Sequence, residues 1–167
     1  MSKEIVIING SGGVGKDAFV EFCNEFTCVK NISSVDKVKE AAKVLVNWDG
    51  TKDDKSRKLL VDLKRLSIEY NDYPAKYIEE QANEFKANDE QQLMFVHIRE
   101  IEEIKKIKTL LNAKTLLITS SRVAKITTNS SDANVEEYDY DYHIKNDGTL
   151  EELKEQAKEF VENLTNK

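Results

Sequence analysis

The chain has 167 residues, 34% of them charged, and 31 acidic residues against 25 basic ones give a net charge of −6. This length suits one domain with a sizeable core, so we read residues 1–167 as a single domain. The acidic balance argues against nucleic acid as the main partner. Because no apolar run nears membrane-spanning length and no leader pattern is present, we expect a cytoplasmic protein with no membrane partner.

The first predicted element is a short buried strand at residues 5–8, which are four consecutive apolar residues. Residues 10–16, GSGGVGK, follow it and match the pattern G-x-x-x-x-G-K. A helical pattern of apolar residues comes next, with Ala18, Phe19 and Phe22. A strand, a glycine-rich turn, a lysine and a helix in this order predict a phosphate-binding loop.

The chemistry of such a loop comes from its main chain. Glycines adopt backbone angles that bring several N–H groups into one concave ring, and the following helix adds partial positive charge at its N-terminus. Lys16 supplies a full charge that can reach a terminal phosphate. The alternative is a glycine-rich turn with an unrelated lysine. The residues expected to bind ATP here are Gly10, Ser11, Gly12, Gly13, Val14, Gly15, Lys16 and Asp17.

Asp17 stands where such loops normally carry Ser or Thr, whose neutral hydroxyl binds Mg²⁺. A carboxylate can still hold the metal, directly or through water, since Mg²⁺ prefers oxygen ligands and usually keeps several waters. The alternative is an acidic residue placed in the first helical turn because the helix dipole favours it there. We predict that Asp17 is the magnesium ligand.

A second strand is predicted at residues 26–32, followed by a helix capped by Ser33 or Ser34. Cys23 and Cys28 form no C-x-x-C pair, so we expect buried or partly buried free thiols in a reducing compartment. The apolar face of the capped helix is expected to comprise Val35, Val38, Ala41, Ala42 and Leu45.

Two more helices are predicted before the next strand. The first spans residues 53–70, and the second begins near Pro74 and runs to about residue 86. On the first, leucines at helical spacing form the apolar face, namely Leu59, Leu60, Leu63 and Leu66. Its other face carries Arg57, Lys58, Lys64 and Arg65.

The rest of the chain alternates strands and helices. Strands are predicted at residues 93–98, 115–119 and 140–144, with a helix at residues 100–111 after the first of them. Thr149 and Glu152 have the spacing of a capping box for a last helix. This alternation predicts an α/β fold with a largely parallel sheet. The polar residues 120–137 are expected to form a lid.

Several stretches together resemble one family of kinases. The GKD ending of the loop, WDGTKD at residues 48–53, residues 57–66, FVHIRE at residues 95–100 and residues 139–149 are similar to P-loop kinases of the phosphomevalonate kinase and phage deoxynucleoside monophosphate kinase type. The resemblance implies a three-layer P-loop NTPase fold with a five-stranded, mostly parallel sheet in the order 2-3-1-4-5. It also implies a helical acceptor-binding insertion at about residues 48–90.

The resemblance assigns roles to three of the four arginines. Arg99 and Arg57 would bind the acceptor, and Arg122 would close on the donor phosphates from the lid. An ion pair with Glu100 or Glu103 is the alternative for Arg99, and Arg65 is expected to be a surface residue. The turn that would lie against the adenine ring comprises Asn146, Asp147 and Gly148.

His97 departs from the family pattern, because many P-loop kinases carry an Asp there that holds the water shell of Mg²⁺. Histidine is a poor magnesium ligand. Asp17 can take over that task, Glu100 can reach in, or the chemistry is impaired. A structural, hydrogen-bonded histidine is the remaining alternative.

The sequence therefore predicts an ATP- and Mg²⁺-dependent small-molecule kinase. The γ-phosphoryl group would go to a small phosphorylated acceptor, a (deoxy)nucleoside monophosphate before phosphomevalonate or another metabolite. Lys16, Arg57, Arg99 and Arg122 are the predicted catalytic residues. A nucleotide-binding sensor without turnover is the alternative, and the chain is expected to be a monomer or a homodimer.

Overall fold

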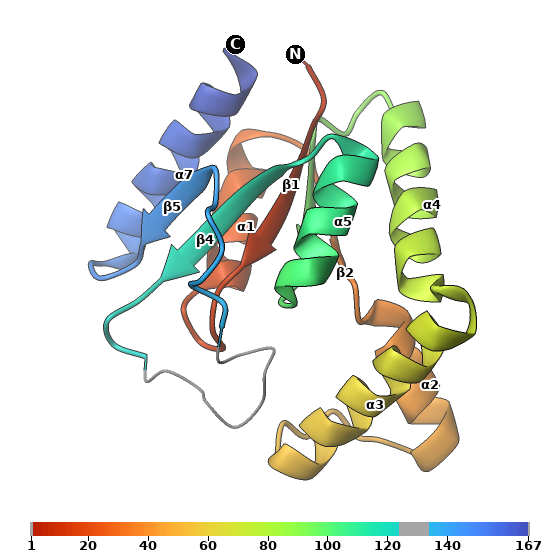
Figure 1. The fold of residues 1–167 in the computed structure, drawn as a ribbon. Helices are drawn as coiled ribbons and strands as arrows, with labels where there is room; N and C mark the ends of the chain where they lie inside the picture. Colours follow the sequence, from red (N-terminus) through yellow and green to blue (C-terminus); the bar gives the residue numbers. More distant parts are fainter. Residues whose placement is uncertain (1, 124–133, 167) are drawn as a thin grey trace.

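The computed structural model describes residues 2–123 and 134–166. Its centre is a parallel sheet in the order β2-β3-β1-β4-β5 (Figure 1). Ile7 in the middle strand pairs with Val96 on one side and Thr115 on the other. The predicted α/β class and the strand order 2-3-1-4-5 are confirmed. The strands are β1 (Glu4–Asn9), β2 (Val29–Ser33), β3 (Leu93–His97), β4 (Lys114–Thr119) and β5 (Tyr142–Lys145).

Helices cover both faces of the sheet. One core layer lies between the sheet and α1 and α7, and the other lies between the sheet and α4 and α5 (Figure 1). The remaining pair, α2 and α3, lies beyond the carboxyl ends of the strands (Figure 1). The helices are α1 (Lys16–Phe26), α2 (Asp36–Val46), α3 (Asp54–Asn71), α4 (Tyr73–Ala87), α5 (Ile101–Leu111) and α7 (Leu150–Thr165).

The middle strand shows why its sequence is continuously apolar. Val6 and Ile8 pack toward α1 and α7, while Ile5 and Ile7 pack toward α4 and α5. A parallel strand with helices on both sides buries both of its faces, so alternation of apolar and polar residues is lost. The run at residues 5–8 was therefore a dependable strand prediction.

Two predicted boundaries near β2 are wrong by a few residues. Phe26 belongs to α1, which ends where the N–H of Thr27 donates to the carbonyl of Cys23. Neither Ser33 nor Ser34 caps α2 with its side chain. Instead the Asp36 carboxylate, in the first turn of α2, accepts from the N–H of Ser33 at 2.9 Å. An acidic side chain of the helix therefore bonds back to the preceding turn, where a serine side chain was expected to bond forward to the helix.

The predicted leucine face of α3 is only partly correct. Leu59, Leu60 and Leu63 are half-buried, and Leu66 is exposed. Lys64, expected on the outer face, is the buried residue of this helix. The reason is the position of α3, which packs mainly against α2 and α4 and not against the sheet. The expected inner face of α2 is likewise incomplete, since Ala41 and Leu45 are exposed.

The end of the chain follows its sequence signals more closely. Thr149 Oγ1 accepts from the N–H of Glu152, and the Glu152 carboxylate accepts from the N–H of Thr149, both at 3.2 Å. The predicted capping box is thus confirmed. Tyr140, predicted to begin the last strand, lies before β5 and is buried with its hydroxyl donating to the carbonyl of Val135.

The two thiols are expected to react very differently. Cys23 is buried, which raises its pKa to about 12, whereas Cys28 is exposed and not partly buried as the sequence suggested. At pH 8 we expect iodoacetamide to modify Cys28 alone in the native chain, because the thiolate is the reactive form. Mass spectrometry of tryptic peptides measures this, with labelling of both thiols in urea as the control. Equal rates at the two sites in the native state would contradict the burial of Cys23.

Candidate functional site

The glycine-rich loop runs from the end of β1 to the start of α1. Gly10, Gly13 and Gly15 all have positive φ angles, of 152°, 83° and 101°. A Cβ atom at Gly15 would lie 2.5 Å from the side-chain nitrogen of Asn146, and one at Gly10 would collide with the carbonyl of Ile118. The loop is therefore closed against β4 and the turn after β5, and larger residues do not fit at these two positions.

Lys16 lies across this loop from the first turn of α1. Its ammonium group donates to the carbonyls of Gly10 and Ser11, the second at 3.3 Å. Asp17 follows in the same helical turn and is exposed. A full positive charge, the N-terminus of an 11-residue helix and a carboxylate thus meet at one point.

Asn9, the last residue of β1, fixes the start of the loop. Its side chain is buried, and its Oδ1 accepts from the N–H of Gly10 at 2.8 Å. Its Nδ2 donates to the carbonyl of Arg99 at 3.2 Å and to the Tyr140 hydroxyl at 2.9 Å. One amide therefore joins the loop to the turn after β3 and to the segment before β5.

A cleft of about 640 Å³ extends from the loop to α2 and α3. Six of the predicted site residues line it together, although they come from three separate parts of the chain: Gly12, Gly13, Lys16, Asp17, Arg57 and Arg99. Because the strands are parallel, the turns after β1, β2 and β3 meet at one edge of the sheet and form the floor of this cleft.

The cleft is locally cationic in a chain that is acidic overall. Three acidic residues line it, and two of them are already engaged. The carboxylate of Asp36 accepts from Ser33 N–H and from the Tyr77 hydroxyl, both at 2.9 Å, and Glu100 pairs with Lys64 at 2.8 Å. Six lysine and arginine residues line the same cleft, so positive charge is in excess there. The cations along the cleft, apart from Lys64, are Lys16, Lys39, Lys52, Arg57 and Arg99.

The two arginines of α3 differ in position. Arg57 lines the cleft and pairs with Asp54 at 3.0 Å on the helix surface. Arg65 pairs with Glu69 at 3.0 Å and is exposed, as expected for a surface residue. A surface ion pair of this kind contributes little energy, so Arg57 can exchange Asp54 for another anion at small cost.

Arg122 and the turn at residues 146–148 lie on the other flank of the glycine-rich loop. Arg122 Nη2 donates to the carbonyl of Asn146 at 2.8 Å, and the Asn146 side chain donates to the carbonyl of Val14 at 2.9 Å. Asp147 accepts from the N–H of Ser121 at 2.7 Å. The structure thus brings Arg122 together with Asn146 and Asp147, and not with Arg57 and Arg99.

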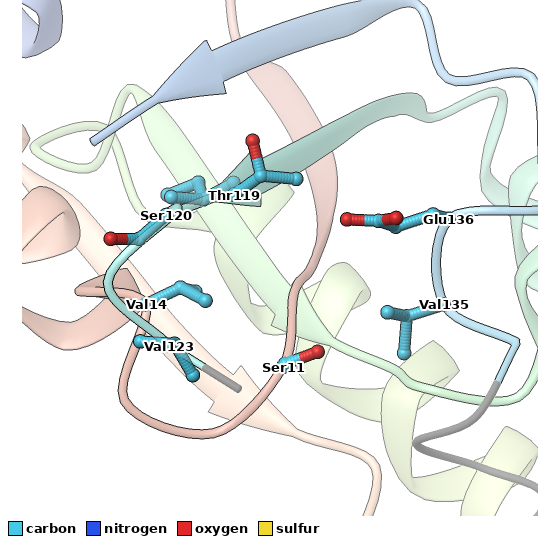
Figure 2. Close-up of a pocket in the computed structure, with 8 residues that line it drawn as sticks. Ser11, Val14, Thr119, Ser120, Val123, Val135 and Glu136 are labelled. Atoms are coloured by element: carbon cyan, nitrogen blue, oxygen red, sulfur yellow. The ribbon is translucent and has the colours of Figure 1, made fainter. Parts of the chain in front are cut away.

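A small pocket of about 60 Å³ lies on this second flank. Figure 2 shows it between Ser11 and Val14 of the loop and the segment carrying Val135 and Glu136. Thr119, the last residue of β4, and Ser120, which follows it, form another of its walls. Residues 124–133 of the expected lid lie outside the described part of the chain.

His97 is held as a neutral, hydrogen-bonded side chain. Its Nε2 lies 2.8 Å from Asn31 Oδ1, across the pairing of β2 and β3. Burial lowers the pKa of His97 to about 4, and the nearby Lys16 charge adds to this effect. A neutral imidazole at this place supplies no positive charge to a phosphate.

The residues of the cleft fit a magnesium ion that is bound mainly by substrate. Asp17 offers one hard oxygen ligand beside Lys16, while Glu100 is engaged by Lys64. In the described residues no group of three or more acidic, histidine or cysteine side chains could hold a metal alone. Mg²⁺ commonly binds through one or two carboxylates together with phosphate oxygens and water, which this arrangement allows.

Sequence reasoning missed several residues of the cleft. Arg57, Leu60, Val61 and Lys64 follow one another at the i, i+3, i+4, i+7 spacing of a single helix face, and all four line the cleft. This spacing could have placed Lys64 on the same face as Arg57. Nothing local marked Asn9, which matters through contacts with residues 90 and 131 positions away. Polar residues of the cleft that the sequence did not single out also include Asn31, Asp36 and Lys39.

The fold is similar to that of solved kinases. A dephospho-CoA kinase from Campylobacter jejuni aligns over 99% of both chains with a TM-score of 0.55 and 17% identity. A shikimate kinase from Aquifex aeolicus aligns over 96% of this chain and 98% of its own, with a TM-score of 0.52 and 12% identity. A Thermus thermophilus protein gives a TM-score of 0.61 and 18% identity over 99% and 100% of the two chains. At these identities the likeness shows a shared fold.

No protein-family model matches the chain, and a search of curated proteins gives no match. In the described ranges, 2–123 and 134–166, no helix has the length and apolarity required to cross a bilayer.

The lowered pKa of His97 predicts a loss of stability in mild acid. An unfolded histidine titrates near pH 6.5, so between about pH 6.5 and 4 the unfolded chain binds more protons than the folded chain. The free energy of unfolding therefore falls as the pH drops through this window. At pH 5 this one group is expected to cost about 1–2 kcal/mol relative to pH 7.

Urea unfolding of His97→Asn at pH 7 and pH 5 measures this contribution. In this variant the unfolding free energy should fall by about 1–2 kcal/mol less between pH 7 and pH 5 than it does in the wild type. His143→Asn is the matched control, because His143 is exposed. If both variants lose stability as the wild type does, His97 is not held neutral.

Proposed function

We propose that this protein is an ATP-dependent kinase that transfers the γ-phosphoryl group to a small phosphorylated acceptor, most favourably a nucleoside monophosphate. The observation that carries the proposal is the cleft that joins the glycine-rich loop to two arginines. Lys16 and Asp17 line it from the start of α1, and Arg57 and Arg99 line it from α3 and the turn after β3. A donor phosphate and an anionic acceptor would meet between these two groups.

The donor phosphates would bind in the loop. Its glycines have the positive φ angles that let backbone N–H groups converge on an anion, and α1 contributes its N-terminal partial charge. Lys16 would exchange the carbonyls of Gly10 and Ser11 for the terminal phosphates. Gly10–Lys16 of the loop and Asp17 are thus the proposed ATP-binding residues.

The nucleotide base would lie on the flank formed by residues 146–148. Asn146 already contacts the loop through the carbonyl of Val14, and Arg122 contacts Asn146. An adenine ring resting against this turn would place Arg122 close to the donor phosphates. We therefore propose that Arg122 acts on the donor side, apart from the acceptor arginines.

The acceptor would occupy the part of the cleft beneath α3. A volume of about 640 Å³ is within the range of small-molecule sites, and Arg57 and Arg99 each offer a fork of N–H donors that matches a phosphate. Val35, Leu60 and Val61 add apolar wall to the same cleft. A phosphate attached to a partly apolar group, as in a nucleotide, suits both features.

The transfer itself requires positioning and charge neutralisation. An acceptor phosphate oxygen attacks the γ-phosphorus in line, and the bond from that phosphorus to the β–γ bridging oxygen breaks. A phosphate is largely ionised near pH 7, so its oxygen needs no base to remove a proton. Bound Mg²⁺, held by Asp17, would neutralise charge on the phosphates. Lys16, Arg57 and Arg99 would neutralise the remaining negative charge on the donor and acceptor phosphates.

A nucleotide-binding sensor without turnover is the second candidate. The observation that favours it is His97, a neutral side chain at the strand end where related kinases carry a carboxylate. Such a protein would bind ATP at the same loop and would show no transfer to any acceptor.

A screen for ADP release tests the proposal. We expect release with ATP, Mg²⁺ and at least one member of a panel of ribo- and deoxynucleoside monophosphates, with phosphomevalonate included for comparison. Lys16→Ala should lower kcat by roughly 100- to 1000-fold, because a charge that stabilises the transferring group is removed. Lys58→Ala is the control, since Lys58 is an exposed lysine paired with Asp62. Full activity of Lys16→Ala would place the site elsewhere, and ATP binding without transfer would favour the sensor.

The two acceptor arginines predict a split in the kinetic constants. Arg99→Ala and Arg57→Ala should each raise KM for the acceptor by roughly 10- to 100-fold, which is the value of a charge-assisted hydrogen bond, with KM for ATP little changed. Arg65→Ala, on the same helix but outside the cleft, should leave both constants alone. A rise in KM for ATP with no change for the acceptor would contradict the placement of the two arginines.

A further inference from the structure

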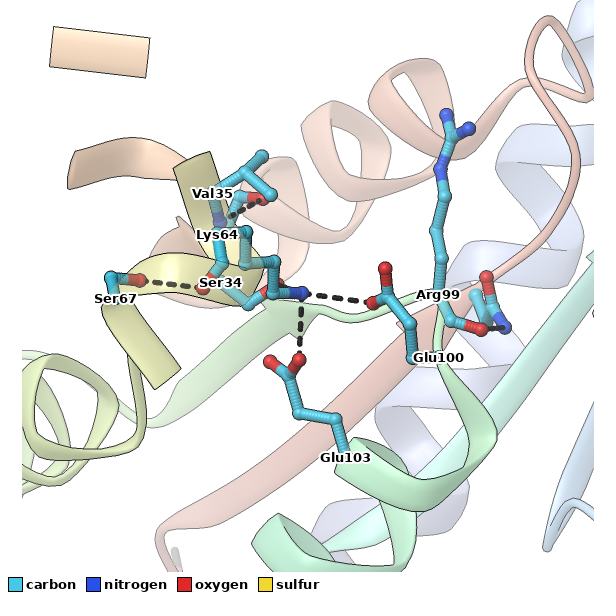
Figure 3. A network of polar contacts seen from close by, with 9 residues as sticks. Ser34, Val35, Lys64, Ser67, Arg99, Glu100 and Glu103 are labelled. Carbon is cyan, nitrogen blue, oxygen red and sulfur yellow. Dashed lines mark hydrogen bonds and ion pairs between the residues drawn. The ribbon is translucent and has the colours of Figure 1, made fainter. Parts of the chain in front are cut away.

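The buried residue of α3 is a lysine. The side chain of Lys64 is only 5% exposed, although seven apolar or aromatic residues belong to the same helix. Its Nζ lies 2.6 Å from Glu103 Oε2 and 2.8 Å from Glu100 Oε2, and it donates to Ser34 Oγ at 3.0 Å (Figure 3). A buried ammonium group with three oxygen partners is a specific structural feature, because burial is costly for a charge that is not so compensated.

These contacts join three separate elements. Lys64 comes from α3, and Ser34 directly follows β2. Glu100 is the N-cap residue of α5, and Glu103 lies in the first turn of that helix. Ser34 is itself fixed to the sheet, since its N–H donates to the carbonyl of His97 at 3.0 Å. The ammonium group therefore lies where the pair α2 and α3 meets the edge of the sheet.

The charge of Lys64 is used within this cluster. The two carboxylates raise the pKa of Lys64 in spite of its burial, so the ammonium form is retained. Burial raises the pKa of Glu103, whose two oxygens are shielded from solvent. With one positive and up to two negative charges, the cluster has no net attraction for an anion. Lys64 lines the acceptor cleft but is not a phosphate ligand by this reasoning.

The position of Glu100 links the cluster to the proposed acceptor site. Glu100 directly follows Arg99, and Figure 3 shows the Arg99 side chain extending away from Glu100. The carbonyl of Arg99 is bonded to Asn9. The turn after β3 is thus held by Asn9 on one side and by Lys64 on the other. Arg57 stands two helical turns before Lys64 on α3, so the same ammonium also fixes the helix that carries it.

We propose that Lys64 is a positioning residue that fixes α3 against the turn after β3 and so sets the placement of Arg57 relative to Arg99. The expected effect of Lys64 on the KM for the acceptor rests on the proposed function, whereas its expected effect on the stability of α3 does not. Loss of Lys64 would leave the glycine-rich loop intact and would loosen only the acceptor side of the cleft.

The test compares variants that separate position from stability. Lys64→Met leaves two carboxylates without their partner, and this alone destabilises the fold. The double variant Lys64→Met/Glu103→Leu also removes the more buried carboxylate, so it should fold with a Tm near that of the wild type while the link to α5 is gone. Lys58→Met is the matched control on the exposed side of α3. Ser34→Ala removes only the neutral contact and gives a third, milder variant.

Hydrogen exchange followed by mass spectrometry is the first measurement. In the double variant we expect the amides of α3 to exchange roughly tenfold faster than in the wild type, with α1 and β1 unchanged, because the anchor of α3 is lost and the core is not. Ser34→Ala should show a smaller change in the same helix, and Lys58→Met none. Wild-type exchange in α3, or an equal increase in all elements, would overturn the proposal.

Steady-state kinetics is the second measurement, with ATP and the nucleoside monophosphate that the wild type phosphorylates fastest. KM for this acceptor should rise roughly tenfold in the double variant, while KM for ATP stays within about twofold. Equal changes in both constants would show a general structural role and would overturn the proposal. If the wild type phosphorylates no acceptor, the proposed function fails, and the exchange measurement still decides the role of Lys64.

Discussion

The side-chain amide of Asn9 is the interaction on which the site depends. It is buried, and its hydrogen bonds join the first residue of the glycine-rich loop, the carbonyl of Arg99 and the hydroxyl of Tyr140. Leaving a buried amide without its partners costs more free energy than its hydrogen bonds contribute, so displacing any one of these three segments destabilises the position of the other two. The loop conformation and the position of Arg99 are therefore coupled through one buried side chain at the floor of the cleft.

The glycine-rich loop divides the site into two sides with different partners. On one flank, Asn146 contacts Val14 and is contacted by Arg122. On the other, the cleft leads to Arg57 and Arg99. The strand order explains the division, because β4 and β5 lie on one side of β1 while β3 and β2 lie on the other. The topology thus separates a candidate donor side from a candidate acceptor side.

The sequence predicted the features that rest on local patterns. The apolar run at residues 5–8, the glycine-rich loop and the capping box of Thr149 and Glu152 all follow from neighbouring residues, and the structure contains them. Features that rest on tertiary contacts were missed. Lys64 appeared to be a surface residue because only its pairing with α5 and Ser34 buries it. Asn9 gave no signal, since its partners are distant in the sequence.

The attachment of α3 has a thermodynamic consequence. Helix α4 is held by buried apolar side chains, among them Ile78 and Phe85, whereas the buried side chain of α3 is an ammonium ion. Heat capacity changes mainly with exposed apolar area, so detaching α3 would change it much less than detaching α4. The enthalpy of detaching α3 would therefore vary less with temperature than the enthalpy of detaching α4. The attachment of α3 would therefore have a flatter stability curve with temperature than the hydrophobic layers on either side of the sheet.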